Sequence, residues 1–214
     1  MNTMVETQAK PRSLVSLWIL IAIFALPPIA AWIFFFNPQW LPDGRTNHGE
    51  LIDPPRAMAS LKLQTPEGTT FDWQALQNMW TLTLVSEGGC DAACIETLIK
   101  VRQMRRATGA NRQRIERLLI LLPDSKGRLD LPNLQGLEGT HLLIAESDQR
   151  DNLLSLFPVD LSAQAISLFL IDPQVDLMMT HNTVQISTKQ ILQDLEKLLK
   201  ASQSWAQGGQ YGHK

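Results

Sequence analysis

The sequence lacks an excess of charge of either sign. Lysines and arginines number 19, aspartates and glutamates 21, and the formal net charge is −2. A protein that binds nucleic acid requires a clustered basic face, and this balance gives no support for one, so no nucleic-acid partner is expected. Internal repeats and low-complexity tracts are absent as well. After the first ~48 residues, which include one apolar block, roughly 165 remain, enough for a single domain with a real core.

Charged residues are missing altogether from Leu14 to Phe36. A helix of that length extends about 34 Å, enough to cross a hydrocarbon core of about 30 Å. Pro27 and Pro28 should kink it, which membrane helices tolerate. A buried core helix would not be apolar on every face. A cleaved signal peptide would have a shorter apolar stretch with small residues after it, not Phe34-Phe35-Phe36. Residues 14–36 are therefore expected to form a transmembrane helix.

The charges beside this segment predict its orientation. Lys10 and Arg12 precede it, and no basic cluster follows it. Because positively charged flanks stay in the cytoplasm, residues 1–13 are predicted to be cytoplasmic and the rest to be exported to the periplasmic side. The chain is thus expected to be a single-pass membrane protein.

The exported part divides into three stretches. Residues 37–58 are rich in Pro, Asn and Gly and are expected to form an irregular connector. Residues 59–205 carry the periodic patterns of a folded domain. The polar, Gly-rich residues 206–214 are expected to be a flexible tail.

Within the domain, strand and helix patterns alternate. β-formers and continuous apolar runs predict a short hairpin and five strands, at residues 61–71, 80–85, 115–122, 141–145, 166–171 and 177–179. Helical periodicity predicts a helix over residues 95–109 and another capped by Thr188, with a leucine-rich face. The order indicates an α/β fold, a mixed sheet flanked by helices, with a cysteine-bearing turn between a strand and a helix.

Cysteine is scarce, and its two copies stand together in Cys90-Asp-Ala-Ala-Cys94. On a helical turn this spacing places both side chains on one face, with Cβ atoms about 5–6 Å apart. The pair could close a disulfide or hold one soft metal ion. A disulfide closing so short a loop would stabilise the fold by only about 2 kcal/mol. Two unrelated buried thiols fit poorly with the Gly88-Gly89 turn that precedes them. Redox or metal chemistry is therefore favoured over a structural role.

The charges around the pair act in opposite directions. A helix N-terminus lowers the pKa of a thiol and favours the thiolate. Glu87, Asp91 and Glu96 oppose this effect, because negative charge disfavours a second anion. Such a neighbourhood suits cation binding better than nucleophilic attack.

The apolar anchor, the strand from Trp80, the Cys-x-x-x-Cys pair and the later Leu170-Ile171-Asp172-Pro173 together resemble the SCO/SenC family. Asn47-His48-Gly49 and Arg102-Gln103-Met104-Arg105 with Arg117 look similar to a divergent bacterial branch of oxidase assembly proteins. The resemblance implies a thioredoxin-like fold in the bacterial inner membrane. It also implies copper as a cofactor and cytochrome c oxidase subunits or other assembly factors as partners.

The chain departs from that family at its proposed site. Family members usually have Pro after each cysteine, where this chain has Asp91 and Ile95. Their copper site adds a histidine, and Leu161 occupies its place here. The other histidines, among them His48 and His141, are expected to be ordinary loop or strand-end residues. The predicted redox or metal site therefore comprises Cys90 and Cys94, with His181 as the candidate to replace the missing ligand.

Three functions remain open. The first is an accessory protein that assists assembly or copper-centre maturation of a haem-copper oxidase through Cys90 and Cys94, an assembly factor more than a turnover enzyme. The second is a general periplasmic thiol–disulfide oxidoreductase, although such enzymes more commonly carry Cys-x-x-Cys. The third is a scaffold or accessory subunit of the oxidase that retains the fold without the chemistry.

The predicted orientation can be tested with a reporter fusion. Alkaline phosphatase fused after Trp205 should be active, because the enzyme folds only where disulfides form. A reporter that works only in the cytoplasm should be silent at the same position. The opposite pair of results would overturn both the orientation and the disulfide-permissive setting.

Overall fold

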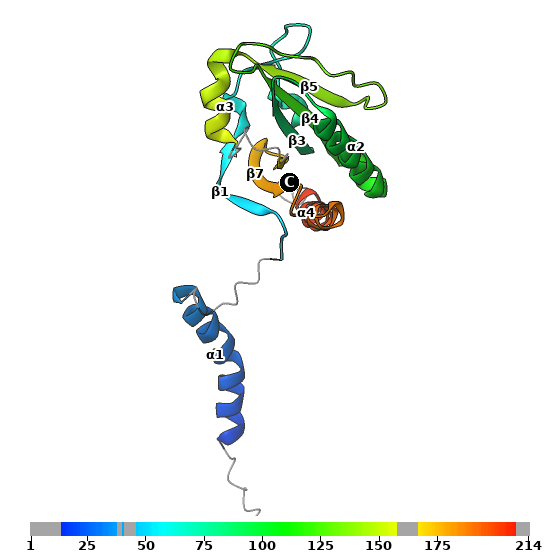
Figure 1. The fold of residues 1–214 in the computed structure, drawn as a ribbon. Helices are drawn as coiled ribbons and strands as arrows, with labels where there is room; N and C mark the ends of the chain where they lie inside the picture. The colour runs from blue at the N-terminus through cyan, green and yellow to red at the C-terminus, as the bar shows by residue number, and fades with distance from the viewer. Residues whose placement is uncertain (1–13, 38–39, 41–45, 158–166, 209–214) are drawn as a thin grey trace, which may run out of the picture. The chain divides into compact units, whose positions relative to one another are not determined.

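The computed structural model describes residues 14–37, 40, 46–157 and 167–208 (Figure 1). The chain forms two compact units, residues 1–46 and 47–214. Four parts of the sequence-based expectations lie outside the described residues: the cytoplasmic segment 1–13 with its two basic residues, most of the linker before residue 46, the stretch that contains Leu161, and the end of the tail.

The first unit contains one long helix, α1 (Val15–Phe36). None of its side chains is buried, and Pro27 and Pro28 lie inside it. Among the described residues it is the one helix long and apolar enough to cross a membrane. This result fits a single-pass membrane protein.

The second unit is built on a mixed sheet of seven strands, in the order β1-β7-β6-β3-β4-β5-β2. The strands β3, β4 and β5 are parallel to one another, and each of the other four is antiparallel to its neighbour. Their bounds are β1 Glu50–Ala57, β2 Leu63–Gln64, β3 Trp80–Glu87, β4 Ile115–Leu122, β5 Thr140–Ala145, β6 Ser167–Ile171 and β7 Asp176–Asn182.

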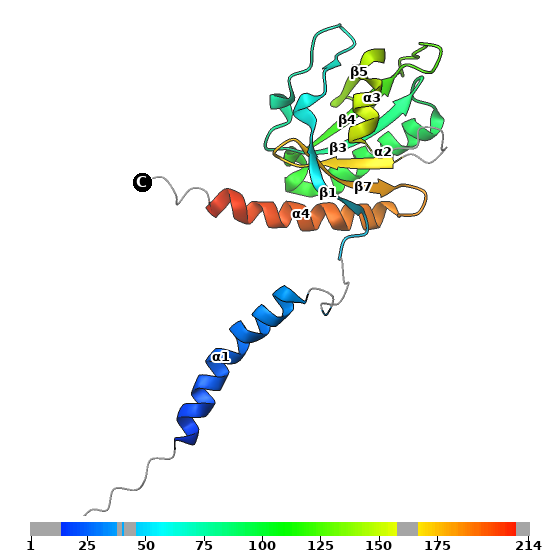
Figure 2. The ribbon, with the colours of Figure 1, turned by 90° about the vertical axis from the view of Figure 1, so that its left-hand side faces the viewer.

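Helices cover both faces of the sheet (Figure 1, Figure 2). One face packs against α2 (Ala92–Ala107) and α4 (Thr188–Gly208), and the opposite face lies under α3 (Arg150–Leu156). Short 3-10 helices fill the connections, at Met58–Ser60, Trp73–Leu76, Gly109–Arg114 and Ser147–Gln149. This arrangement confirms the predicted α/β, thioredoxin-like class.

The apolar runs of the sequence correspond to the central strands. In β4 the residues from Arg117 to Leu122 are all buried, because both faces of this strand are covered. The strand over residues 115–122 and its neighbours were predicted correctly. The helix expected at 95–109 is confirmed, although it begins three residues earlier and ends at Ala107.

Three local expectations were wrong. Residues 50–57, assigned to an irregular connector because of Pro54 and Pro55, form the edge strand β1, where proline is tolerated. The helix α3 was not predicted, since its seven residues are too few to show a clear period. The last helix extends to Gly208, three residues into the expected tail.

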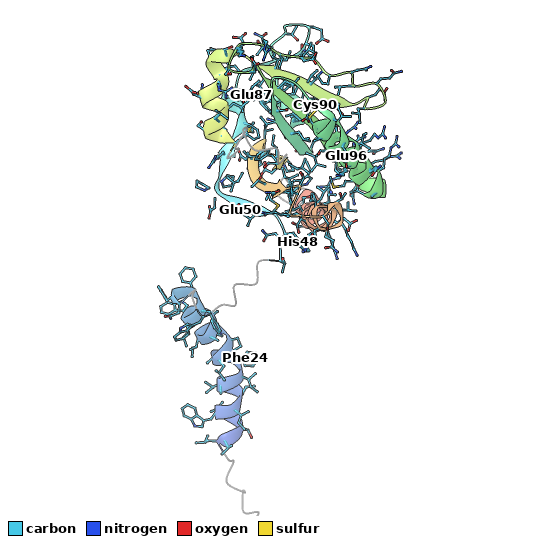
Figure 3. All side chains as sticks on the ribbon, viewed as in Figure 1. Phe24, His48, Glu50, Glu87, Cys90 and Glu96 are labelled. Carbon is cyan, nitrogen blue, oxygen red and sulfur yellow. A yellow bond between two sulfur atoms is a disulfide. The ribbon has the colours of Figure 1, made fainter. Side chains whose placement is uncertain are left out.

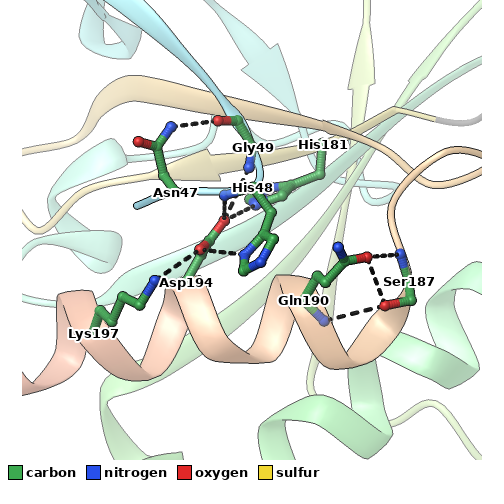
Figure 4. Close-up of polar contacts among 8 residues, drawn as sticks. All are labelled: Asn47, His48, Gly49, His181, Ser187, Gln190, Asp194 and Lys197. Atoms are coloured by element: carbon green, nitrogen blue, oxygen red, sulfur yellow. Dashed lines mark hydrogen bonds and ion pairs between the residues drawn. The ribbon is translucent and has the colours of Figure 1, made fainter. Parts of the chain in front are cut away.

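Ser187, rather than Thr188, caps the last helix. The Ser187 hydroxyl accepts the backbone N–H of Gln190 at 3.4 Å, and the Gln190 side-chain oxygen accepts the N–H of Ser187 at 3.0 Å. This is the reciprocal pattern of a capping box, in which two otherwise unpaired helical donors are satisfied. Figure 4 shows the pair at the beginning of α4.

A buried carboxylate on α4 holds the first residues of the domain. Asp194, 2 % exposed, accepts the backbone N–H of His48 at 2.7 Å and that of Gly49 at 2.9 Å (Figure 4). It also contacts His48 Nδ1 at 3.0 Å and His181 Nε2 at 3.3 Å. We call His48, Gly49, His181 and Asp194 the carboxylate latch. It joins the chain before β1 to β7 and α4, elements more than 130 residues later.

The latch shifts the pKa values of its members. Burial alone would raise the pKa of Asp194, but the donors from Gly49 and His48 together outweigh it and hold that pKa below its ordinary value of 3.8. Burial lowers the pKa of His181, and the neighbouring Asp194 offsets only part of this effect. At neutral pH the latch therefore contains an ionised aspartate and a neutral His181.

Replacing Asp194 by asparagine should destabilise the domain. The change removes the charge that accepts two backbone N–H groups and leaves buried donors poorly paired, so we expect a loss of about 3 kcal/mol in the free energy of unfolding. Because the folded-state pKa of Asp194 is depressed, its contribution is complete above pH 3.8 and is lost as the pH falls through the folded value. Denaturant titration at pH 7 measures the difference.

The matched control for this experiment is Glu196→Gln. It makes the same acid-to-amide change at an exposed position on the same helix, and should alter stability by less than about 0.5 kcal/mol. Equal stability of the Asp194→Asn and Glu196→Gln variants would contradict the structural role of the latch.

Candidate functional site

The two cysteines form a disulfide at the turn between β3 and α2. Their Cα atoms lie 5.2 Å apart. Asp91 caps the helix by accepting the backbone N–H of Cys94 at 2.8 Å, so Cys90 precedes the helix and only Cys94 lies within it. The sequence predicted that both cysteines lie on one face of a helix, which is wrong for Cys90 because it precedes the helix. The predicted contact between the two side chains is present. Figure 3 labels Cys90 near the start of α2.

Two glycines shape the backbone before Cys90. Gly88 and Gly89 have φ values of 73° and 145°, which favour glycine. The N–H of Gly88 donates to Leu122 O at 2.7 Å, and its carbonyl accepts the N–H of Asp130 at 2.9 Å. A Cβ atom on Gly89 would lie 2.8 Å from the Asp130 carbonyl oxygen. The cysteine turn is therefore fixed against two neighbouring segments, and position 89 has no room for a side chain.

The two sulfurs differ in exposure. Cys94 is 1 % exposed and belongs to the apolar core between α2 and the sheet. Cys90 is half-buried and lies at the margin of the same core. A thiolate from another molecule can therefore approach Cys90, while Cys94 remains covered.

The acidic side chains near the pair are largely compensated. Glu87 pairs with Arg150 at 2.8 Å, an arginine supplied by α3. Glu96 pairs with Lys100 at 2.8 Å, and this lysine holds the pKa of Glu96 below its ordinary value. Asp91 uses one oxygen for the helix cap. The local excess of negative charge expected from the sequence is thus mostly neutralised in the fold.

The histidines lie in other surroundings. His181 and His48 belong to the carboxylate latch, and His141 on β5 lies 3.5 Å from Glu116. In the part of the chain that the structure describes, no group of three or more His, Cys, Asp or Glu side chains could hold a metal ion. Cys90 and Cys94 are brought together; His181 is placed with Asp194 instead.

The latch was missed by sequence reasoning, although it left a signal. Asp194 interrupts the apolar face formed by Ile191, Leu195 and Leu198, so its position on the helix already predicts burial. A buried carboxylate needs donors, and the nearby His181 is one of them. The partners His48 and Gly49 lie too far away in sequence to be found by any local pattern.

Comparisons with known proteins give the same fold. The sequence profile of a family described as "Transmembrane-like, thioredoxin-like, C-terminal domain" matches residues 80–202. Yeast Sco1 superposes with a TM-score of 0.53 at 15 % identity, over 66 % of this chain and 92 % of that chain. Yeast Sco1 with copper bound gives the same score and identity over 73 % and 95 %.

A bacterial structure is equally similar. Apo Sco1 from Thermus thermophilus has a TM-score of 0.53 at 14 % identity, over 73 % of this chain and 99 % of that chain. No curated protein matches the sequence. The resemblance to SCO/SenC proteins is confirmed at the level of the fold. Because the family profile covers more than half of its length, the chain belongs to the family of transmembrane-like, thioredoxin-like C-terminal domains.

Proposed function

We propose that the chain is a membrane-anchored accessory protein that assists assembly or copper-centre maturation of a haem-copper oxidase, with its folded domain in the periplasm. The observation that carries this proposal is the disulfide at the β3–α2 turn, with one sulfur half-buried and the other covered. The thioredoxin-like fold and its likeness to yeast Sco1 with copper bound support it. The apolar helix α1 would supply the anchor.

Disulfide exchange would begin at Cys90. A thiolate of the partner attacks the Sγ of Cys90, a bond forms between these two sulfurs, and the Cys90–Cys94 bond breaks. The electron pair leaves on the Cys94 sulfur. This thiolate lies in the first turn of α2, where the helix dipole favours negative charge. A second partner thiolate then resolves the mixed disulfide, so the partner gains a disulfide and the accessory protein becomes a dithiol.

The dithiol form would carry copper as cargo. Two thiolates select Cu(I), a soft ion, and a Cα separation of 5.2 Å allows both sulfurs to reach one ion. The donor set therefore fits Cu(I) better than Cu(II), which favours additional nitrogen or oxygen donors. His181 is proposed as a third ligand, and it would have to leave Asp194 in order to bind.

Copper titration of the reduced full-length chain tests this chemistry. We expect one Cu(I) per chain, with binding abolished in both Cys90→Ser and Cys94→Ser, because each variant leaves a single thiolate. The variant His181→Ala should reduce Cu(I) affinity only if that side chain is a ligand, with His141→Ala as the matched control. Leu161→His should strengthen Cu(II) binding by restoring the ligand that the family has.

Absence of Cu(I) binding by the wild-type chain would refute a copper-carrying role. Tight Cu(II) binding by the wild-type chain would show that a further nitrogen or oxygen ligand is present.

A deletion strain tests the cellular role. Under copper limitation it should show lower oxidase activity and less assembled oxidase, and the wild-type gene should restore both. The double variant Cys90→Ser/Cys94→Ser should fail to do so, with Glu196→Gln, at an exposed position on α4, as a control that should restore both. Normal oxidase assembly in the deletion strain would refute the proposal. Full complementation by the double variant would show that the protein acts as a scaffold.

A further inference from the structure

Arginines gather at the end of the domain opposite the cysteines. Residues 102–117 contain six arginines and one glutamate. Three of them, Arg102, Arg105 and Arg106, share one face of α2 because they are three and four residues apart. Arg117 comes from the beginning of β4, on the side of the sheet that α2 covers. We call these four residues the arginine face.

The parallel strands determine where this face lies. Trp80 pairs with Ile115, and Arg117 pairs with Thr140, so β3, β4 and β5 begin at the same edge of the sheet. The helix α2 runs back toward this edge and ends there, whereas Cys90 follows the opposite end of β3. The cysteine turn and the arginine face are therefore at opposite ends of one helix.

No carboxylate pairs with the arginine face among the described residues. Arg105 Nε donates to the carbonyl oxygen of Ile115 at 2.6 Å. Arg102 and Arg117 donate to the carbonyl oxygens of residues 136 and 138. Arg106 is exposed and makes no hydrogen bond or ion pair within the described chain. Carbonyl oxygens are neutral, so these bonds orient the guanidinium groups without pairing their charge. The Glu138 carboxylate, whose pKa is lowered mainly by its hydrogen bond from the Gly136 N–H, offsets part of the charge of Arg102 and Arg117.

Arg117 is unusual because it is charged and 3 % exposed. Its Nε and Nη1 atoms have no hydrogen-bond partner in the described structure. Burial lowers the pKa of Arg117, and repulsion by Arg105 lowers it further. Glu116 projects toward His141 on the other side of the sheet, and the Glu138 carboxylate accepts the N–H of Gly136. Buried arginines are normally paired, so this charge adds to a positive field that Glu138 and Glu116 offset only in part.

We propose that the arginine face binds an acidic segment of a partner protein, through aspartate or glutamate carboxylates. Carboxylates match the planar donors of arginine and would neutralise the clustered charge. The half-buried Arg102 and Arg105 and the exposed Arg106 provide the contacts, and Arg117 adds its charge from beneath them. This surface is separate from the cysteine turn, so one domain could engage a thiol partner and an acidic partner at the same time.

The chain enters the domain at the end opposite the arginine face. Glu50 pairs with Thr180, Ser167 pairs with Asn182, and Leu168 pairs with Leu84. The chain therefore enters β1 at the strand end where β3 leads to Cys90, away from the arginine face.

The test uses the full-length chain in phosphatidylcholine nanodiscs and a fluorescent hexaglutamate peptide. Anisotropy should report binding that weakens with salt, and hexaglutamine should not bind. Arg106→Gln should weaken the affinity about threefold to fivefold, and Arg102→Gln/Arg106→Gln about tenfold or more. The control Arg56→Gln/Arg128→Gln removes two positive charges outside the arginine face and should change affinity less than twofold. Arg56 is a matched choice because it also donates to carbonyl oxygens.

Arg106→Gln alone keeps the proposal testable if the double variant unfolds, because Arg106 makes no bond within the described fold. Failure of the wild-type chain to bind hexaglutamate would overturn the proposal, as would equal losses in the Arg106 and control variants. Tighter binding to phosphatidylglycerol vesicles than to the peptide, lost through the same substitutions, would identify the surface as a lipid site and also overturn it. None of these outcomes depends on copper or on the cysteines.

Discussion

The parallel pairing of β3 with β4 is the constraint on which the rest of the domain depends. Eight residue pairs join the strands, from Trp80 with Ile115 to Glu87 with Leu122. Parallel neighbours cannot be joined by a tight turn, so the chain must return along the sheet through α2. That crossover begins beside Cys90 and ends among the arginines. A single hydrogen-bonding requirement thus places the cysteine turn and the arginine face at the two ends of one helix.

The sequence predicted the parts of the fold that local chemistry determines. The continuous apolar run at 115–122 indicated a strand buried on both faces, and Cys90 was placed correctly between a strand and a helix. Edge strand β1 was missed because prolines usually interrupt strands. The strand order shows that β1 lies at one end of the sheet, where it pairs with β7 alone. Pairing between strands that are far apart in the sequence produces no periodic pattern of residues that a local stretch of sequence could reveal.

The candidate site was predictable to a similar extent. The spacing of Cys90 and Cys94 predicted their contact, but it gave no information on which sulfur is covered, since this depends on how α2 packs. The acidic character assigned to the turn was only partly right, because Arg150 comes from a helix that the sequence did not reveal. The net charge of the whole chain also gave no indication of the local basic region. A net charge of −2 conceals a region with six arginines and one glutamate.

The close packing of Gly49 against His181 has an evolutionary consequence. A Cβ atom at position 49 would lie 2.5 Å from His181 Nε2, so any larger residue there requires a different ring or a displaced strand. The same ring contacts Asp194, which also accepts the backbone N–H groups of His48 and Gly49. These positions should therefore change together or not at all during divergence. Homologues that have lost both cysteines should still carry the four residues of the carboxylate latch. Such homologues would have kept the fold without the cysteine chemistry.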